Sequence, residues 1–109
     1  MRQYRKRVDP NQADIVKALE RAGCTVCKLD GMGGGVPDLL VGYGGKHNIL
    51  MEVKCRTQGR AAGHLSKFER AHGGLKETQW KWHGEWKGQV ATVWTVEEAL
   101  AVLAEVTQG

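Results

Sequence analysis

The clearest structural signal in this chain lies in residues 37–54, whose sequence is PDLLVGYGGKHNILMEVK. Apolar runs at 37–42 and 48–54 flank a glycine-rich connection, a pattern typical of a β-hairpin. If the hairpin folds symmetrically about Gly45, Asp38 lies opposite Glu52, with Cβ atoms about 5 Å apart. Side chains alternate along a strand, so Lys54 shares the face of Glu52. The other face carries the apolar residues Leu39, Val41, Met51 and Val53. A one-residue slip would separate the acidic pair, so the predicted site depends on this register.

The acidic pair beside Lys54 suggests hydrolysis of a phosphodiester. Two carboxylates this close repel each other, and a shared divalent cation relieves that repulsion. Carboxylate oxygens suit Mg²⁺ or Mn²⁺, which keep bound waters and also bind phosphate oxygens. Lys54 is then placed to activate water or to stabilise charge that develops on phosphorus. The alternative is an ordinary surface ion triad on a solvated sheet face.

Further elements are expected on both sides of the hairpin. Asp9, Pro10 and Gln12 indicate a helix start, as cap, first helical residue and N3 residue, and this helix ends at Gly23. Strands are expected at 24–29 and 89–94, a helix at about 77–87, and a short helix at 66–72. A capping box of Thr95 and Glu98 opens a last helix. The order αβββαβα predicts one α/β domain over residues 1–109.

The positive charge is concentrated in two segments. The chain has 109 residues and a net charge of +4, from 16 Lys and Arg against 12 Asp and Glu. A basic N-terminal tail (residues 1–8) and a basic loop (residues 55–74) both suit a DNA partner, because cations near phosphates release counterions. The candidate DNA-binding residues are Arg2, Arg5, Lys6, Arg7, Arg56, Arg60, Lys67 and Arg70. The alternative is a tail and a loop that only face solvent.

The composition argues against several classes of protein. Hydrophobic residues make up 41% and charged residues 26%, and no apolar run approaches the roughly 18 residues of a membrane span. No signal peptide is recognisable, and three cysteines without a second ligand pair favour reduced thiols over zinc, as in a cytoplasmic protein. The glycines at 31 and 33–35 do not join a strand to a helix, so no nucleotide cofactor is expected.

The order of these motifs resembles a known nuclease family. Pro37-Asp38, then Glu52-Val53-Lys54 fourteen residues after Asp38, is similar to the PD-(D/E)XK nuclease pattern. The neighbouring residues resemble its VRR-NUC branch, particularly the compact members of bacteria and phages. A Leu-x-x-x-Gln segment, Leu75 to Gln79, follows as it does in that branch. The resemblance covers residues 9 to about 103, and it implies a restriction-endonuclease-like core with a mixed central sheet flanked by helices.

The resemblance also implies roles for individual residues. Asp38 and Glu52 would hold Mg²⁺ or Mn²⁺ with the carbonyl of Val53, and Lys54 would be the catalytic lysine. Gln79 would reach the site from its helix and position water, the metal or Lys54. Family members often carry an acid and a glutamine on the first helix. Asp9 and Gln12 are the nearest matches here, which makes Asp9 a further candidate metal ligand.

The chain departs from the family pattern in three places. Asp9 differs in residue type from the usual Glu, the segment between Lys54 and Leu75 is long, and Lys76 stands where Thr or Ser usually caps the helix. Residues 65–69 form a second, weaker version of the Leu-x-x-x-Gln motif. We prefer Gln79, because only this register gives the expected positions to the stripe of Trp82, His83 and Trp86. Core packing is favoured for the tryptophans of this stripe over base stacking.

The sequence thus predicts a metal-dependent DNA endonuclease, with branched DNA such as a four-way junction as the leading candidate substrate. A homodimer is expected, because related stand-alone nucleases resemble junction-resolving enzymes and a C2 pair is the commonest assembly. The alternative is a non-catalytic DNA-binding or assembly module that keeps the nuclease fold. A third possibility is a structural protein with a fortuitous ion triad.

Overall fold

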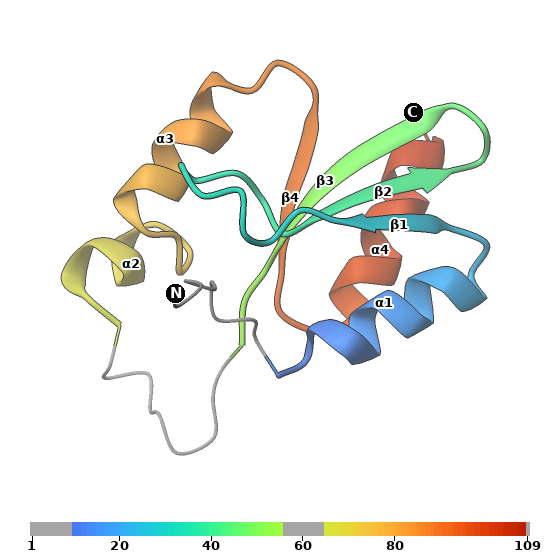
Figure 1. Ribbon diagram of the computed structural model, residues 1–109, viewed down its shortest axis with the longest axis horizontal. Coiled ribbons are helices and arrows are strands. Elements are labelled where there is room, and N and C mark those ends of the chain that lie inside the picture. Colours follow the sequence, from blue (N-terminus) through green and yellow to red (C-terminus); the bar gives the residue numbers. More distant parts are fainter. Residues whose placement is uncertain (1–9, 56–64, 109) are drawn as a thin grey trace, which may run out of the picture.

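The computed structural model describes residues 10–55 and 65–108, in which four strands form one sheet with helices packed around it (Figure 1). The helices are α1 (Gln12–Arg21), α2 (Lys67–Ala71), α3 (Glu77–Glu85) and α4 (Val96–Gln108). The strands are β1 (Thr25–Lys28), β2 (Leu39–Tyr43), β3 (His47–Val53) and β4 (Gln89–Val93). This is an α/β fold, and its element order differs from the prediction only by α2, at the place where a short helix was expected.

The hairpin of β2 and β3 has the predicted register. Leu39 pairs with Met51, Leu40 with Leu50, and the pairing continues in step to Tyr43 and His47, so that partner numbers always sum to 90. β1 joins β2 in antiparallel orientation, and β4 joins β3 in parallel, which gives a mixed sheet of order β1-β2-β3-β4. The parallel pair is possible because α2 and α3 form the long crossover between β3 and β4.

The main core lies between one face of the sheet and two helices. Helices α1 and α4 pack against each other, and in Figure 1 α4 overlaps the strands while α1 lies below them. The fully buried members of this core include Ile15, Leu19, Leu39, Val41, Met51 and Val93. Each such side chain contributes about 1.5–3 kcal/mol through burial. This apolar layer therefore stabilises the sheet, whose opposite face is left to carry other residues.

The first helix begins later than the sequence suggested. Asn11 is its N-cap residue and Gln12 its first helical residue, so Gln12 is not the N3 residue of a capping box. The Asn11 side chain makes no capping bond, because its amide donates to the carbonyls of Lys54 and Trp94 at 3.0 and 2.9 Å. A tertiary contact has therefore replaced the local cap, and it ties the start of α1 to the ends of β3 and β4.

The basic segment before α3 ends in a short helix. Ser66 and Glu69 form a reciprocal capping box that opens α2, so residues 65–69, like the Gln79 motif, mark the start of a helix. The expected core stripe on α3 is only partly correct. Gln79 is buried, but Trp82 and His83 are half-buried, and Trp86 stacks on Trp82 while remaining 44% exposed. Trp82, His83 and Trp86 therefore lie outside the main core.

Within residues 10–55 and 65–108, no helix combines the length and the apolar character that a membrane crossing requires.

Candidate active site

Asp38 stands where β2 and β3 stop pairing through their backbones. The last backbone pair is Leu39 with Met51, and Asp38 comes immediately before it. Its carboxylate accepts the N–H of Val53 at 2.8 Å, while its backbone carbonyl accepts the N–H of Leu29 at 2.7 Å. Only 6% of the Asp38 surface is exposed. The side chain therefore bridges to β3 beyond the end of the backbone ladder, and this bond fixes the direction of the carboxylate.

Glu52, Lys54 and Gln79 form one connected hydrogen-bonded group. The Lys54 ammonium donates to Gln79 Oε1 at 2.8 Å, and Gln79 Nε2 donates to Glu52 Oε2 at 3.0 Å. Lys54 Nζ also lies 3.9 Å from the same Glu52 oxygen. Glu52 is 2% exposed and Gln79 is 7% exposed. In such a dry setting these charge-assisted bonds are stronger than they would be in water.

The position of Gln79 is fixed by the first turn of α3. Its Oε1 also accepts the backbone N–H of Lys76 at 2.9 Å, the N3-to-cap half of a capping box. Lys76 itself gives the helix no side-chain hydrogen bond, because an ammonium group cannot accept from the backbone N–H groups. One amide therefore both caps the helix and reaches the two charged groups on β3.

The glycine-rich loop before Asp38 packs directly against α3. Gly35 has a φ of +87°, and a Cβ placed there would meet the carbonyl of Thr78 and lie 3.1 Å from Trp82 Cβ. Only glycine allows this close approach of backbone to helix. The loop thus joins the segment that carries Asp38 to the helix that carries Gln79.

The start of α1 reaches the same region through two polar residues. Asn11 donates to the backbone carbonyl of Lys54, and Gln12, which is 3% exposed, donates to Asp30 Oδ1 at 3.5 Å. Sequence reasoning identified neither Asp30 nor the contact of Asn11 with Lys54. No local signal predicts them, because both contacts join segments far apart in the chain.

The charge of Lys54 contributes to the lowered pKa values of two further titratable groups, His83 and Glu69. Burial, and then the nearby Lys54 charge, lower the pKa of His83 below its usual value. The pKa of Glu69 on α2 is lowered mainly by the hydrogen bond from the Ser66 N–H, with smaller contributions from the charges of Lys54 and Lys76. Helix α2 therefore lies within electrostatic reach of the site.

The donor set at the site fits a hard divalent cation in part. Asp38 and Glu52 supply two buried carboxylates, the first just before and the second just after the paired residues Leu39 and Met51. Mg²⁺ is often held by one or two carboxylates together with water and phosphate oxygens. Among the residues that the structure describes, no group of three or more His, Cys, Asp or Glu side chains could hold a metal ion. Asp9, the predicted third carboxylate, lies outside the described residues.

The predicted DNA-binding residues fall into two sets. Lys67 and Arg70 lie on α2 and are exposed, and Arg70 donates to the carbonyl of Leu65 at 2.7 Å. The remaining predicted contacts, Arg2, Arg5, Lys6, Arg7, Arg56 and Arg60, lie outside the described residues.

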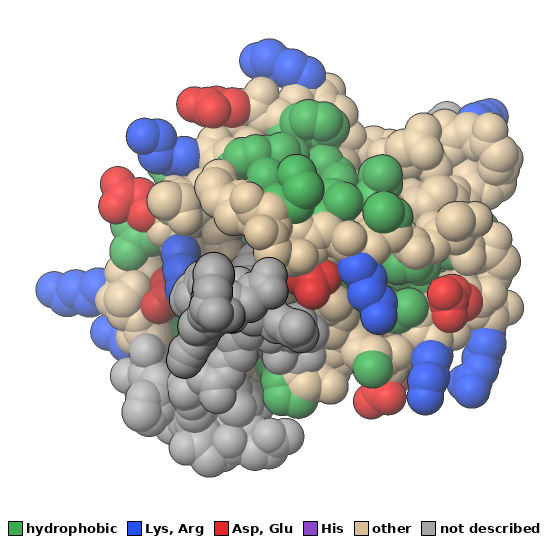
Figure 2. Space-filling model, in the orientation of Figure 1, with side chains coloured by type: hydrophobic (Ala, Val, Ile, Leu, Met, Phe, Trp, Pro, Cys, Tyr) green, Lys and Arg blue, Asp and Glu red, His purple; other side chains and the backbone are tan. Residues whose placement is uncertain are grey.

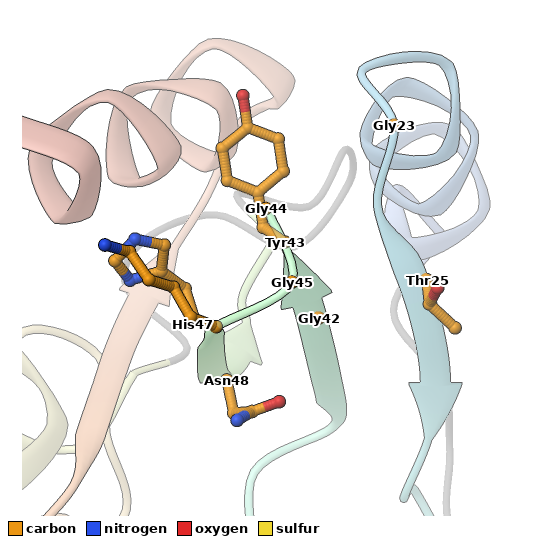
Figure 3. A pocket seen from close by; sticks show the side chains of 9 residues that line it. Gly23, Thr25, Gly42, Tyr43, Gly44, Gly45, His47 and Asn48 are labelled. Carbon is orange, nitrogen blue, oxygen red and sulfur yellow. The ribbon is translucent and has the colours of Figure 1, made fainter.

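A hollow of about 270 Å³ lies at the other end of the sheet, around the turn of the β2–β3 hairpin (Figure 3). The side chains of Thr25 and Asn48 flank Gly42, which lies between them in the pairing. Lys46 and His47 also line it, but no carboxylate does. The hollow is therefore not the site that the sequence predicts.

Comparisons of the chain with protein-family models, with curated proteins and with solved structures found no match. What the site can do is therefore inferred from its residues and their geometry. Four of the predicted site residues, Asp38, Glu52, Lys54 and Gln79, come together at one end of the sheet in a buried polar group.

Proposed function

We propose that this chain is a metal-dependent endonuclease that hydrolyses DNA phosphodiester bonds. The observation that carries the proposal is the buried chain of contacts from Lys54 through Gln79 to Glu52, with Asp38 beside it. Burying two carboxylates, with the partly buried ammonium group of Lys54 beside them, has a high desolvation cost. A purely structural role would be served as well by apolar side chains, so this costly arrangement favours chemistry.

Asp38 and Glu52 are the residues that would hold Mg²⁺ or Mn²⁺, with the Val53 carbonyl as a third donor. A divalent cation bound there supplies charge neutralisation at the phosphate and lowers the pKa of water. The hydrogen bond from the Val53 N–H already orients the Asp38 carboxylate, so this donor needs little rearrangement before binding.

Lys54 is the residue that we assign to the reacting phosphate. Its ammonium group can stabilise negative charge on phosphorus or orient an attacking water. Gln79 holds that group at 2.8 Å and keeps it near Glu52, which makes Gln79 a positioning residue. The mixed sheet with its helices agrees with a restriction-endonuclease-like core of the VRR-NUC type, and we propose that fold family on the order of motifs.

Cleavage of DNA by the purified chain tests this function. Linear duplex, flap and four-way-junction DNA would be compared in Mn²⁺, Mg²⁺ and EDTA, with the Lys54→Ala variant in parallel. We expect metal-dependent cutting that falls at least 100-fold in Lys54→Ala, because a charge aimed at the transition state contributes roughly 3 kcal/mol or more. Lys28→Ala, which removes an exposed lysine from β1, serves as the matched control and should cut normally.

The opposite outcome is equally informative. If the chain binds DNA without cutting it in any metal, and Lys54→Ala binds equally well, the enzyme proposal fails for the isolated chain. The protein would then be a DNA-binding module that keeps the arrangement of a nuclease. We further propose that the working form is a homodimer, and sedimentation of the free and DNA-bound protein tests that point.

A further inference from the structure

An exposed tryptophan projects from α3 next to the candidate site. Trp80 directly follows Gln79 in the sequence and is 48% exposed. Its indole ring meets the rings of Phe68 and His72 on α2 at centroid distances of 6.0 and 4.9 Å. Both contacts are close to perpendicular, at 82° and 69°, so neither ring lies flat on the indole. Trp80 is thus supported from α2 and still open to solvent.

The support beneath Trp80 is itself ordered. Phe68 and His72 stack on each other at 3.9 Å, and the His72 ring nitrogen Nδ1 is 2.8 Å from the carbonyl of Phe68. The capping box of Ser66 and Glu69 fixes the start of this helix. An aromatic ring held this firmly loses little conformational freedom when another flat group stacks on it.

The surroundings of Trp80 are basic. Residues 65–87 carry five cations, namely Lys67, Arg70, Lys76, Lys81 and Lys87, against the three carboxylates of Glu69, Glu77 and Glu85. Figure 2 shows Lys and Arg side chains projecting from the side of the molecule on which α2 and α3 lie. All five cations are exposed, whereas Glu69 is half-buried and engaged with Ser66. An anionic partner is therefore favoured over an apolar protein surface.

We infer that Trp80, supported by Phe68 and His72, is a stacking platform for an unpaired DNA base beside the scissile phosphate. An open aromatic ring among cations suits a nucleobase with its phosphate, and every base offers a π-face for stacking. Bases inside a duplex are already stacked, so only a frayed, flapped or branched strand can use this platform. The inference rests on DNA being the substrate, and it narrows that substrate to DNA with an unpaired stretch next to the cleavage position.

The position of the platform agrees with this substrate. Gln79 Oε1 contacts the Lys54 ammonium group, and Trp80 is the next residue on the same helix. Successive side chains on a helix differ in direction by about 100°. Trp80 therefore points in a different direction from Gln79, while the two residues remain adjacent on α3.

Binding of single-stranded DNA in EDTA tests the platform without any cleavage. Fluorescence anisotropy would compare a labelled oligothymidylate with an oligonucleotide of the same length that has an abasic sugar at every position. The two probes then carry equal phosphate charge. We expect the chain to bind the oligothymidylate about tenfold more tightly. Trp80→Ala should abolish this preference, and Trp80→Phe should keep most of it. Trp86→Ala is the matched control, because Trp86 is also exposed but stacks on Trp82.

Each other outcome overturns the platform. Equal binding of the two oligonucleotides by the unaltered chain excludes base stacking even if Trp80→Ala disturbs α2. Loss of the preference in Trp86→Ala but not in Trp80→Ala would show that Trp86, and not Trp80, stacks on the base. A change of oligomeric state in Trp80→Ala with unchanged base preference shows that the surface binds a second copy instead. None of these results affects the cleavage assay, so the nuclease proposal stands or fails separately.

Discussion

Gln79 carries more of the candidate site than any other uncharged residue. Its Oε1 accepts from Lys54 and from the Lys76 backbone, and its Nε2 donates to Glu52. An amide accepts at its oxygen and donates from its nitrogen without carrying charge. The residue therefore connects the helix to both charged groups on β3.

Replacing Gln79 by Glu separates its two functions. The variant keeps oxygen acceptors for Lys54 and for the Lys76 N–H but loses the donor to Glu52, and it places a second carboxylate next to that residue. We expect Gln79→Glu and Gln79→Ala both to reduce cleavage about 10- to 100-fold, the range for groups that orient reacting residues. Urea unfolding should show that both variants lose stability, Gln79→Ala by about 1–2 kcal/mol through its empty capping position and Gln79→Glu through repulsion between two adjacent buried carboxylates. Normal cleavage by both variants would remove Gln79 from the mechanism.

The depressed pKa of His83 predicts a pH dependence of stability. Burial and the Lys54 charge disfavour the protonated ring in the folded chain, so its pKa lies below the usual value of about 6.5. In the window just below pH 6.5 the unfolded chain binds more protons at this residue than the folded chain does. The free energy of unfolding therefore falls as the pH decreases through that window and is recovered above it.

Urea unfolding at pH values from 5 to 7.5 measures this dependence. His83→Gln removes the titrating ring, so the slope of stability against pH in this window should become smaller. Titration of the His83 ring by NMR gives the same pKa directly. A ring pKa above 6.5, or an unchanged slope in the variant, would contradict the proposed placement of His83 near Lys54.

At the scale of elements, the contact between the glycine loop and α3 holds the two halves of the site together. Gly35 and Gly34 both have positive φ, at +87° and +66°. A Cβ at Gly35 would press on α3, whereas a Cβ at Gly34 has nothing within 4 Å. The two positions therefore share backbone strain and differ in steric contact.

Alanine substitutions at these two glycines exploit that difference. Gly34→Ala should lose about 1 kcal/mol, from the left-handed conformation alone. Gly35→Ala should lose a further 1–3 kcal/mol, because the added methyl group must displace α3 or the loop. Since α3 carries Gln79, cleavage should fall at least tenfold in Gly35→Ala and stay normal in Gly34→Ala. Equal stability of the two variants in urea would argue against the close packing.

The elements show which parts of the structure a sequence can predict. The hairpin register followed from the apolar alternation and the glycine turn, both of which are local. The predicted start of α1 was wrong, because the side chain of Asn11 bonds to Lys54 and Trp94, more than forty residues away. The exposure of Trp86 was missed for a similar reason. Helical spacing identifies a stripe, but only the tertiary arrangement decides what covers it.

At the scale of the whole molecule, the two faces of the sheet have separate tasks. One face packs on α1 and α4 and contains the apolar core. Alternation along β3 therefore puts Glu52 on the opposite face, with α3 and its Gln79. The sequence predicted this division, because the two neighbours of Glu52 in the chain, Met51 and Val53, are both apolar and suit the core. It could not predict that α2 packs against α3, since that contact is made by the aromatic rings of Phe68, His72 and Trp80.

Metal-linked stability tests the whole arrangement at once. A cation that binds only the folded chain raises the free energy of unfolding by RT ln(1 + [L]/Kd), about 2.7 kcal/mol at one hundred times Kd. For a domain of this size we expect Mn²⁺ to raise Tm by roughly 10 °C under such saturation. Asp38→Asn should abolish the increase, because it removes the charge while keeping an oxygen for the Val53 N–H. Asp14→Asn, on the exposed surface of α1, should show the full increase. A Tm increase that survives in Asp38→Asn would show that the cation binds elsewhere. If Mn²⁺ does not raise the Tm of the unaltered chain, Asp38 and Glu52 do not bind this metal in the folded protein.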